Sequence, residues 1–126
     1  PLTNNAKLGI LHGAAAYVCQ NNEGQINNTE SISAGLDYPG VSPIHCFLKD
    51  TKRARYTSAT DEAALSAYKL VTRLERINPS LEPSHAFAEA IKIAPQLSKN
   101  TIIIVNSCGD AKKDRDILKA RLGKIN

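Results

Sequence analysis

Two stretches in the second half of the chain carry apolar residues at helical spacing. The first covers residues 61–73, where Thr60 can cap a helix and Asp61 and Glu62 place negative charge in its first turn. Its buried stripe is expected to comprise Ala64, Leu65, Tyr68, Val71 and Leu74. A second helix should begin near Ser84, which can act as its cap. Its apolar face is expected to comprise Phe87, Ala90, Ile91, Ala94 and Leu97.

Other stretches have the pattern of strands. Residues 101–105 form an unbroken β-branched run, which predicts a strand buried on both faces and therefore central in a parallel sheet. Alternation over residues 54–58 predicts another strand. Near the start, an apolar run over residues 14–19 and a polar turn at residues 21–24 predict a hairpin, because Gly24 can take the positive φ that such a turn needs.

Short helices are expected at residues 44–48, directly after Pro43, and at residues 111–122. Strands that alternate with helices indicate the α/β class: a layered, mostly parallel sheet flanked by helices, with an N-terminal β-hairpin. No repeat or linker divides the chain, so residues 1–126 are expected to form one unit. Ligands of such sheets bind beyond the carboxyl ends of the strands, which makes residues 106–110 the first place to look for a site.

Composition narrows the class of protein. Hydrophobic residues make up 42% and charged residues 22% of the chain, which is typical of a globular protein and not of a disordered one. No apolar run approaches the roughly 20 residues that span a bilayer, so no membrane association is expected. The net charge is +4, but the basic residues after Lys99 alternate with Asp110, Asp114 and Asp116. No aromatic residue interleaves them, so we expect a solvated helix face there and no nucleic-acid partner.

Few residues offer chemistry at a known spacing. The three cysteines form no CxxC pair, which favours reduced thiols in a cytosol-like compartment, and the three histidines lie far apart, so no metal site is predicted. Two candidates remain. Asp37 lies in a Gly/Pro-rich loop at residues 31–43, and its alternative role is a turn-forming carboxylate that bonds its own backbone. Cys108 follows the predicted strand at residues 101–105, and its alternative role is that of a small buried apolar residue.

The loop around Asp37 also carries a family resemblance. Residues 31–41 read Ser-Ile-Ser-Ala-Gly-Leu-Asp-Tyr-Pro-Gly-Val, which resembles a signature loop of tryptophan synthase β chains. Shorter matches follow in the family's order: Glu-Gly-Gln-Ile at residues 23–26, Thr-Asp-Glu at 60–62, Ser-His-Ala at 84–86, Ile-Ile-Val-Asn at 103–106 and Asp-Ile-Leu-Lys-Ala-Arg at 116–121. The resemblance covers nearly the whole chain and implies the C-terminal part of a fold-type II pyridoxal-phosphate enzyme.

That family replaces the β-hydroxyl of L-serine with indole and uses pyridoxal phosphate as an electron sink. The resemblance implies that Asp37 belongs to a loop that closes over the site and excludes water, and that Glu82 lies near the cofactor ring. Cys108, beside Gly109, falls where the family has a serine that bonds the ring nitrogen; an alignment shifted by one residue gives this role to Ser107. At residue 76 an arginine replaces a glycine of the family.

The lysine that attaches the cofactor, the phosphate-binding loop and the catalytic glutamate of this family have no counterpart in the chain. By itself it is therefore expected not to be an enzyme, and to act only as part of a complete tryptophan synthase-like lyase. The implied partners are the N-terminal part of the β chain, a second β chain and an α chain, in the cytoplasm or, in a plant, the plastid stroma. The alternative is a non-catalytic structural or interaction module derived from this fold.

Overall fold

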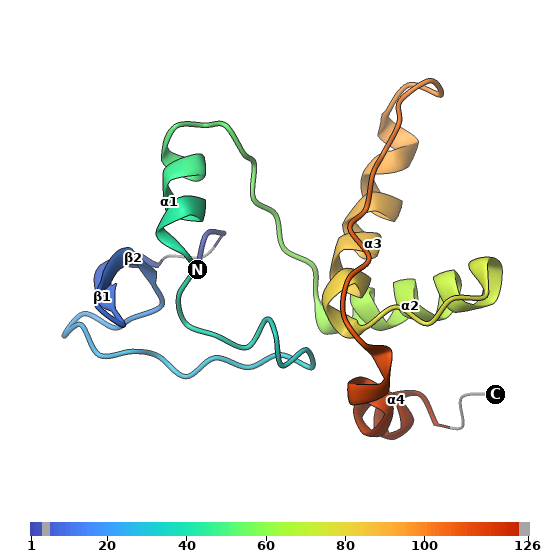
Figure 1. Ribbon diagram of the computed structural model, residues 1–126, viewed down its shortest axis with the longest axis horizontal. Helices are drawn as coiled ribbons and strands as arrows, with labels where there is room; N and C mark the ends of the chain where they lie inside the picture. Colours follow the sequence, from blue (N-terminus) through green and yellow to red (C-terminus); the bar gives the residue numbers. More distant parts are fainter. Residues whose placement is uncertain (4–5, 124–126) are drawn as a thin grey trace. The chain divides into compact units, whose positions relative to one another are not determined.

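The computed structural model describes residues 1–3 and 6–123, and the chain divides into two compact units, Pro1–Ser58 and Ala59–Asn126. The first unit contains a hairpin of β1 (Lys7–Leu11) and β2 (Ala14–Val18), followed by α1 (Pro43–Asp50) (Figure 1). The second contains α2 (Asp61–Glu75), α3 (Leu81–Ile93) and α4 (Arg115–Leu122), with 3-10 helices η1 (Ala94–Gln96) and η2 (Ala111–Asp114). The observed class is therefore mixed α/β.

The N-terminal hairpin is confirmed, but its tight turn lies earlier than the pattern predicts. β1 and β2 pair antiparallel around His12 and Gly13, whose φ angles are 52° and 77°. A two-residue hairpin turn with positive φ at both positions matches the twist of its strands. The expected turn at residues 21–24 also forms, because Gly24 has a φ of 80° and the N–H of Asn21 donates to the carbonyl of Gln25 at 2.9 Å.

Helix α1 forms where the proline predicts it, although it runs to Asp50. The hydroxyl of Ser42 accepts the N–H of Ile44 at 3.3 Å and so caps the helix. Cys46 is the buried residue of this helix, and its sulfur accepts the backbone N–H of Tyr17 at 3.3 Å. The buried thiol thus ties α1 to β2 within the first unit.

Helices α2 and α3 pack against each other and form most of the core of the second unit. Thr60 caps α2 as predicted, its hydroxyl accepting the N–H of Ala63 at 3.2 Å. The predicted stripe is confirmed at Ala64, Tyr68 and Val71, which are buried, whereas Leu74 is 63% exposed near the helix end. Arg76 then ends the helix in the left-handed conformation, with a φ of 59°. Glycine adopts that conformation at the least steric cost.

Helix α3 begins three residues earlier than predicted, at Leu81, and Pro83 is accommodated in its first turn. Its buried residues are concentrated at that start, where Leu81 and Ser84 are fully covered. The apolar face predicted farther along is only partly covered, and Ile91 and Leu97 remain exposed. The well-packed end of α3 is therefore its N-terminus.

The predicted layered parallel sheet does not form among residues 1–3 and 6–123. Their only sheet is the antiparallel hairpin, and residues 54–58 and 101–105 form no strand. The reason is physical: a strand needs a second strand alongside to satisfy its N–H and C=O groups, and among the described residues neither segment pairs with another strand. Ile102 and Ile104 consequently remain 85% and 90% exposed.

The C-terminal helix is confirmed as a 3-10 turn, η2, that continues into α4. Asp110 caps η2 by accepting the N–H of Lys112 at 2.9 Å, and Leu118 of α4 is buried. The solvated face predicted for this segment needs one correction, because Asp114 is 2% exposed. Among the helices that the structure describes, none has the length and apolar character required to cross a bilayer.

Candidate functional site

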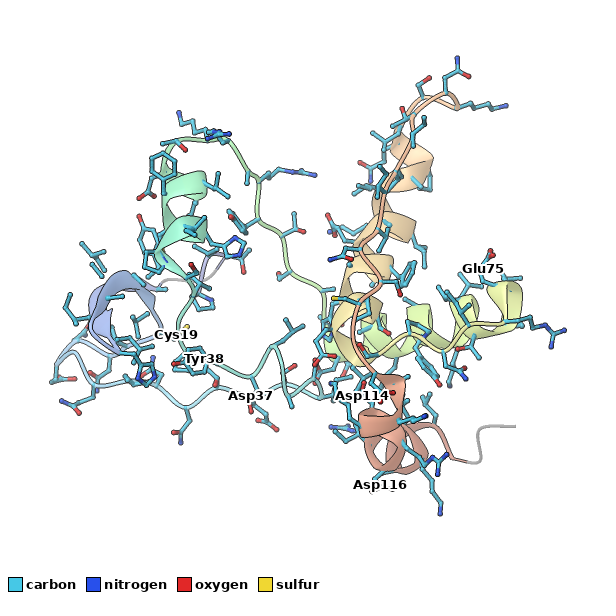
Figure 2. All side chains as sticks on the ribbon, viewed as in Figure 1. Cys19, Asp37, Tyr38, Glu75, Asp114 and Asp116 are labelled. Atoms are coloured by element: carbon cyan, nitrogen blue, oxygen red, sulfur yellow. The ribbon has the colours of Figure 1, made fainter. Side chains whose placement is uncertain are left out.

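The start of α3 is capped by a side chain from far along the sequence. The N–H of Leu81 donates to Oδ2 of Asp114 at 2.8 Å, and both residues are buried. Ser80 stands at the N-cap position, but its hydroxyl donates instead to the carbonyl of Cys108 at 3.0 Å. Because a helix N-terminus leaves N–H groups without intrahelical partners, the Asp114 carboxylate satisfies one of them and complements the helix dipole. Figure 2 shows Asp114 where the segment before α4 reaches the base of α3.

The turn at Cys108 and Gly109 lies against this helix start. Gly109 has a φ of 98°, a conformation that residues with a side chain rarely adopt. A β-carbon at Gly109 would overlap the hydroxyl of Ser80 and would lie 3.9 Å from Oε2 of Glu82. The absence of a side chain at Gly109 therefore lets the turn approach both residues closely.

Lys113 joins the two carboxylates at this end of α3. Its Nζ donates to Oε1 and Oε2 of Glu82 at 2.7 and 2.9 Å and lies 3.0 Å from Oδ1 of Asp114. These contacts raise the pKa of the Lys113 ammonium: the hydrogen bond with Glu82 is the largest cause, burial opposes it, and Asp114 adds to it. Lys113 is therefore a cation at neutral pH, paired with both acids.

The four residues proposed for the cofactor ring thus come from two segments that the fold brings together. Glu82 lies in the first turn of α3, and Ser107, Cys108 and Gly109 lie in the facing turn. The thiol of Cys108 is exposed, so the alternative of a small buried apolar residue is wrong for this chain. Chemically, the turn offers an exposed cysteine and an exposed serine, and its Gly109 lies close to the Glu82 carboxylate, which is paired with the Lys113 ammonium.

Asp37 lies in the first unit, on the loop before α1 (Figure 2). Its side chain is exposed, and its backbone N–H donates to the carbonyl of Ser33 at 3.1 Å. The N–H of Leu36 donates to the same carbonyl at 3.0 Å, so the loop is held as a turn by its backbone. The carboxylate of Asp37 is not among the atoms that form these bonds.

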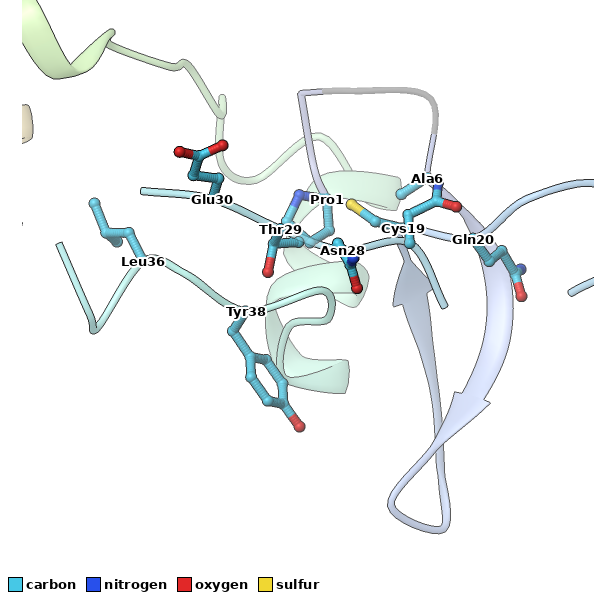
Figure 3. A pocket seen from close by; sticks show the side chains of 10 residues that line it. Pro1, Ala6, Cys19, Gln20, Asn28, Thr29, Glu30, Leu36 and Tyr38 are labelled. Carbon is cyan, nitrogen blue, oxygen red and sulfur yellow. The ribbon is translucent and has the colours of Figure 1, made fainter. Parts of the chain in front are cut away.

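A cavity of about 480 Å³ lies beside this loop (Figure 3). Leu36 and Tyr38, the two neighbours of Asp37, both line it, and the ring of Tyr38 stacks against His12 of the hairpin turn with centroids 6.1 Å apart. Polar residues dominate the rest of the wall: Cys19, Gln20, Asn27, Asn28, Thr29 and Glu30, with Pro1 and Ala6. The loop that carries Asp37 thus forms one wall of a polar cavity in the first unit.

Sequence patterns did not indicate three of the residues that meet at the start of α3. These are Ser80, Lys113 and Asp114. Asp114 has neighbours of similar character at Asp110 and Asp116, and neither of these is buried. A recognisable signal did exist for Ser80, because a serine that precedes a leucine and a glutamate is typical of a helix start. No local pattern could indicate that a carboxylate from another segment would cap this helix.

Comparison with known proteins agrees with the resemblance predicted from the sequence. No family model matches the chain. The tryptophan synthase beta chain of Bordetella petrii is 51% identical to it over 117 residues, and those of Bordetella parapertussis and Bordetella bronchiseptica are each 50% identical over the same length. Each match covers 93% of this chain but only 29% of the relative. Nearly the whole of this chain is therefore similar to a C-terminal part of tryptophan synthase beta chains, of whose length it spans about three tenths.

Proposed function

We propose that this chain is the C-terminal part of a pyridoxal-phosphate-dependent tryptophan synthase β chain, which joins L-serine and indole to give L-tryptophan. The observation that supports this most directly is the cluster at the start of α3. The carbonyl of Cys108 accepts the hydroxyl of Ser80, and Gly109 lies close to both Ser80 and Glu82. The match to the tryptophan synthase beta chain of Bordetella petrii covers 93% of the chain. The chain supplies the contact with the cofactor ring and the closing loop.

The cluster fits the ring of pyridoxal phosphate. The two Glu82 oxygens are occupied by the Lys113 ammonium, whereas the Cys108 thiol and the Ser107 hydroxyl lie on exposed residues of the turn. A thiol or hydroxyl at the ring nitrogen leaves it largely unprotonated, in contrast to a carboxylate, which would hold a proton there. When bound, the cofactor supplies an electron sink for the serine carbon skeleton. Cys108 would orient the ring, and Ser107 is the alternative for this role.

Asp37 has a separate proposed role in the first unit. It is exposed on a loop whose backbone bonds do not use its carboxylate, so the carboxylate is available to pair with a cation when the loop closes. Closing a site in this way excludes water from a reactive intermediate. The alternative, a carboxylate that forms the turn itself, is not supported by the bonds of this loop.

The exposed isoleucines at residues 102 and 104 support the proposal that residues 101–105 become a strand in the complete protein. Two isoleucines 85% and 90% exposed are unusual for a globular surface, and they flank Ile103 in a β-branched run. In a parallel sheet completed by the N-terminal part, both faces of this strand would be covered. Residues 1–126 would then belong to a single fold-type II domain, within a cytoplasmic enzyme that associates with a second β chain and an α chain.

The test is a fusion protein in which this chain replaces the matching C-terminal part of the Bordetella petrii tryptophan synthase beta chain. We expect the fusion protein to bind pyridoxal phosphate and to form tryptophan from serine and indole. The 126-residue chain alone should form none, because the attachment lysine and phosphate loop are lacking. The parent enzyme and a version truncated before the match are the controls. A fusion protein that folds but neither binds the cofactor nor forms tryptophan would support a non-catalytic module instead.

A further inference from the structure

The buried carboxylate of Asp114 has two partners, one far away in the sequence and one adjacent to it. Oδ2 accepts the backbone N–H of Leu81 at 2.8 Å, and Oδ1 lies 3.0 Å from Nζ of Lys113. The Asp114 side chain is only 3% exposed. Burying a carboxylate costs free energy unless a cation balances its charge and hydrogen-bond donors satisfy its oxygens. The first turn of α3 therefore fixes the position of the Asp114 carboxylate, and the Lys113 ammonium balances its negative charge.

The Asp114 carboxylate therefore holds the ammonium group at the end of the Lys113 side chain. Most lysines on a surface lose much side-chain entropy when they pair, which is why isolated pairs contribute little. Here the ammonium has a buried anchor in Asp114 and two short bonds to the oxygens of Glu82. The two bonds from this anchored ammonium favour one direction of the Glu82 carboxylate.

We propose that Lys113 is a positioning residue of the ring site: anchored by Asp114, it holds the Glu82 carboxylate in one orientation beside Gly109, so that the Cys108 thiol and not a carboxylate meets the cofactor ring. The last clause rests on the proposed function, whereas the orientation of Glu82 does not. The turn lies close to this carboxylate, because the ideal β-carbon position of Gly109 is 3.9 Å from Oε2 of Glu82. A change in the orientation of the Glu82 carboxylate would therefore alter the surroundings of the turn.

The orientation is tested in the 126-residue chain by NMR measurement of the three-bond couplings that report the side-chain rotamers of Glu82. In Lys113→Met, we expect these couplings to change from values for one rotamer to averaged values. Lys113→Arg should retain a single rotamer, since a guanidinium can bind both carboxylates. Lys112→Met is the matched control, because it removes the same charge from the adjacent exposed residue. Unchanged Glu82 couplings in Lys113→Met would overturn the proposal.

The consequence for the cofactor is tested in the fusion protein. Lys113→Met should shift the absorption maximum of bound pyridoxal phosphate and raise pyruvate formation from serine, relative to tryptophan formation, by about tenfold, the size expected for losing a charge-assisted hydrogen bond. Lys113→Arg should restore both, and Lys112→Met should alter neither. If the unsubstituted fusion protein binds no cofactor, the proposed function fails, and the rotamer measurement still decides the role of Lys113. A Lys113→Met protein with an unshifted spectrum and an unchanged product ratio would contradict the inference even though the enzyme works.

Discussion

The carboxylate of Asp114 accepts the backbone N–H of Leu81 at 2.8 Å across 33 residues of sequence. This bond joins η2 to the first turn of α3, and the adjacent Lys113 binds Glu82. The buried Asp114 carboxylate therefore contacts both the first turn of α3 and the lysine that binds Glu82, one of the residues proposed to lie near the cofactor ring.

Replacing Asp114 with alanine should destabilise the second unit. The change removes the cap of α3 and leaves the N–H of Leu81 buried without a partner, which costs about 1–3 kcal/mol. Urea unfolding followed by circular dichroism measures the loss. Asp116→Ala is the control, since Asp116 is exposed and its removal should cost no more than about 0.5 kcal/mol. Equal effects of the two substitutions would show that the Asp114 contact adds no stability.

Replacing Arg76 with glycine should stabilise the chain. Arg76 has a φ of 59° at the end of α2, and left-handed backbone costs a residue with a side chain about 1 kcal/mol relative to glycine. The midpoint of urea unfolding should therefore rise. The opposite result is expected for Arg73→Gly, which lies inside the same helix and should lose about 1 kcal/mol of stability. A destabilising effect at Arg76 would indicate that its side chain contributes more than its backbone costs.

The exposed isoleucines should make the chain self-associate. Changing Ile102 and Ile104 together to threonine keeps the β-branched shape but removes apolar surface, so sedimentation velocity should show less association at the same concentration. The unfolding midpoint of the chain should hardly change, because both side chains are exposed. In the fusion protein the same two substitutions should lower the free energy of unfolding, since residues 101–105 would there form a strand buried on both faces. Unaltered stability of the fusion protein would contradict the proposed strand.

Asp37→Ala should leave folding nearly intact and change the products. The side chain is exposed and its loop is held by backbone bonds to Ser33, so stability should stay within about 0.5 kcal/mol. In the fusion protein, water should reach the intermediate more easily, and pyruvate should increase relative to tryptophan. Glu30→Ala, another exposed carboxylate of the first unit, provides the comparison. Loss of folding with an unchanged product ratio would assign Asp37 a structural role only.

If Cys108 contacts the ring nitrogen as proposed, Cys108→Ser should preserve or increase tryptophan formation by the fusion protein, because it would place there the hydroxyl that the family resemblance implies. Cys108→Asp should instead hold a proton on that nitrogen and redirect turnover toward side products. Steady-state assays of tryptophan and pyruvate distinguish these outcomes. Ser107→Ala tests the alternative alignment, and a larger effect at Ser107 than at Cys108 would move the ring contact to Ser107.

The sequence was a good guide wherever a local rule decides the structure. Thr60 caps α2, Pro43 begins α1, and the spacing of Ala64, Tyr68 and Val71 marks the buried face. These features depend on hydrogen bonds and side chains within a few residues, so the sequence contains all the information they need. The run at residues 31–41 was long enough to indicate a resemblance to tryptophan synthase β chains, and the similarity of 93% of the chain to such proteins agrees with it.

Sequence patterns could not determine features that depend on a distant partner. The β-branched run at residues 101–105 has the composition of a buried strand, but strand formation needs a neighbouring backbone that the described residues do not supply. Asp114 resembles its exposed neighbours in sequence, and only the tertiary structure makes it the cap of α3 and the anchor of Lys113. The sequence by itself thus determined the positions of the helices, the cap of α2 and the resemblance to tryptophan synthase β chains, whereas the tertiary structure decided which acid is buried and caps α3. The physical reason is that burial and long-range hydrogen bonds belong to pairs of segments and cannot be read from either segment alone.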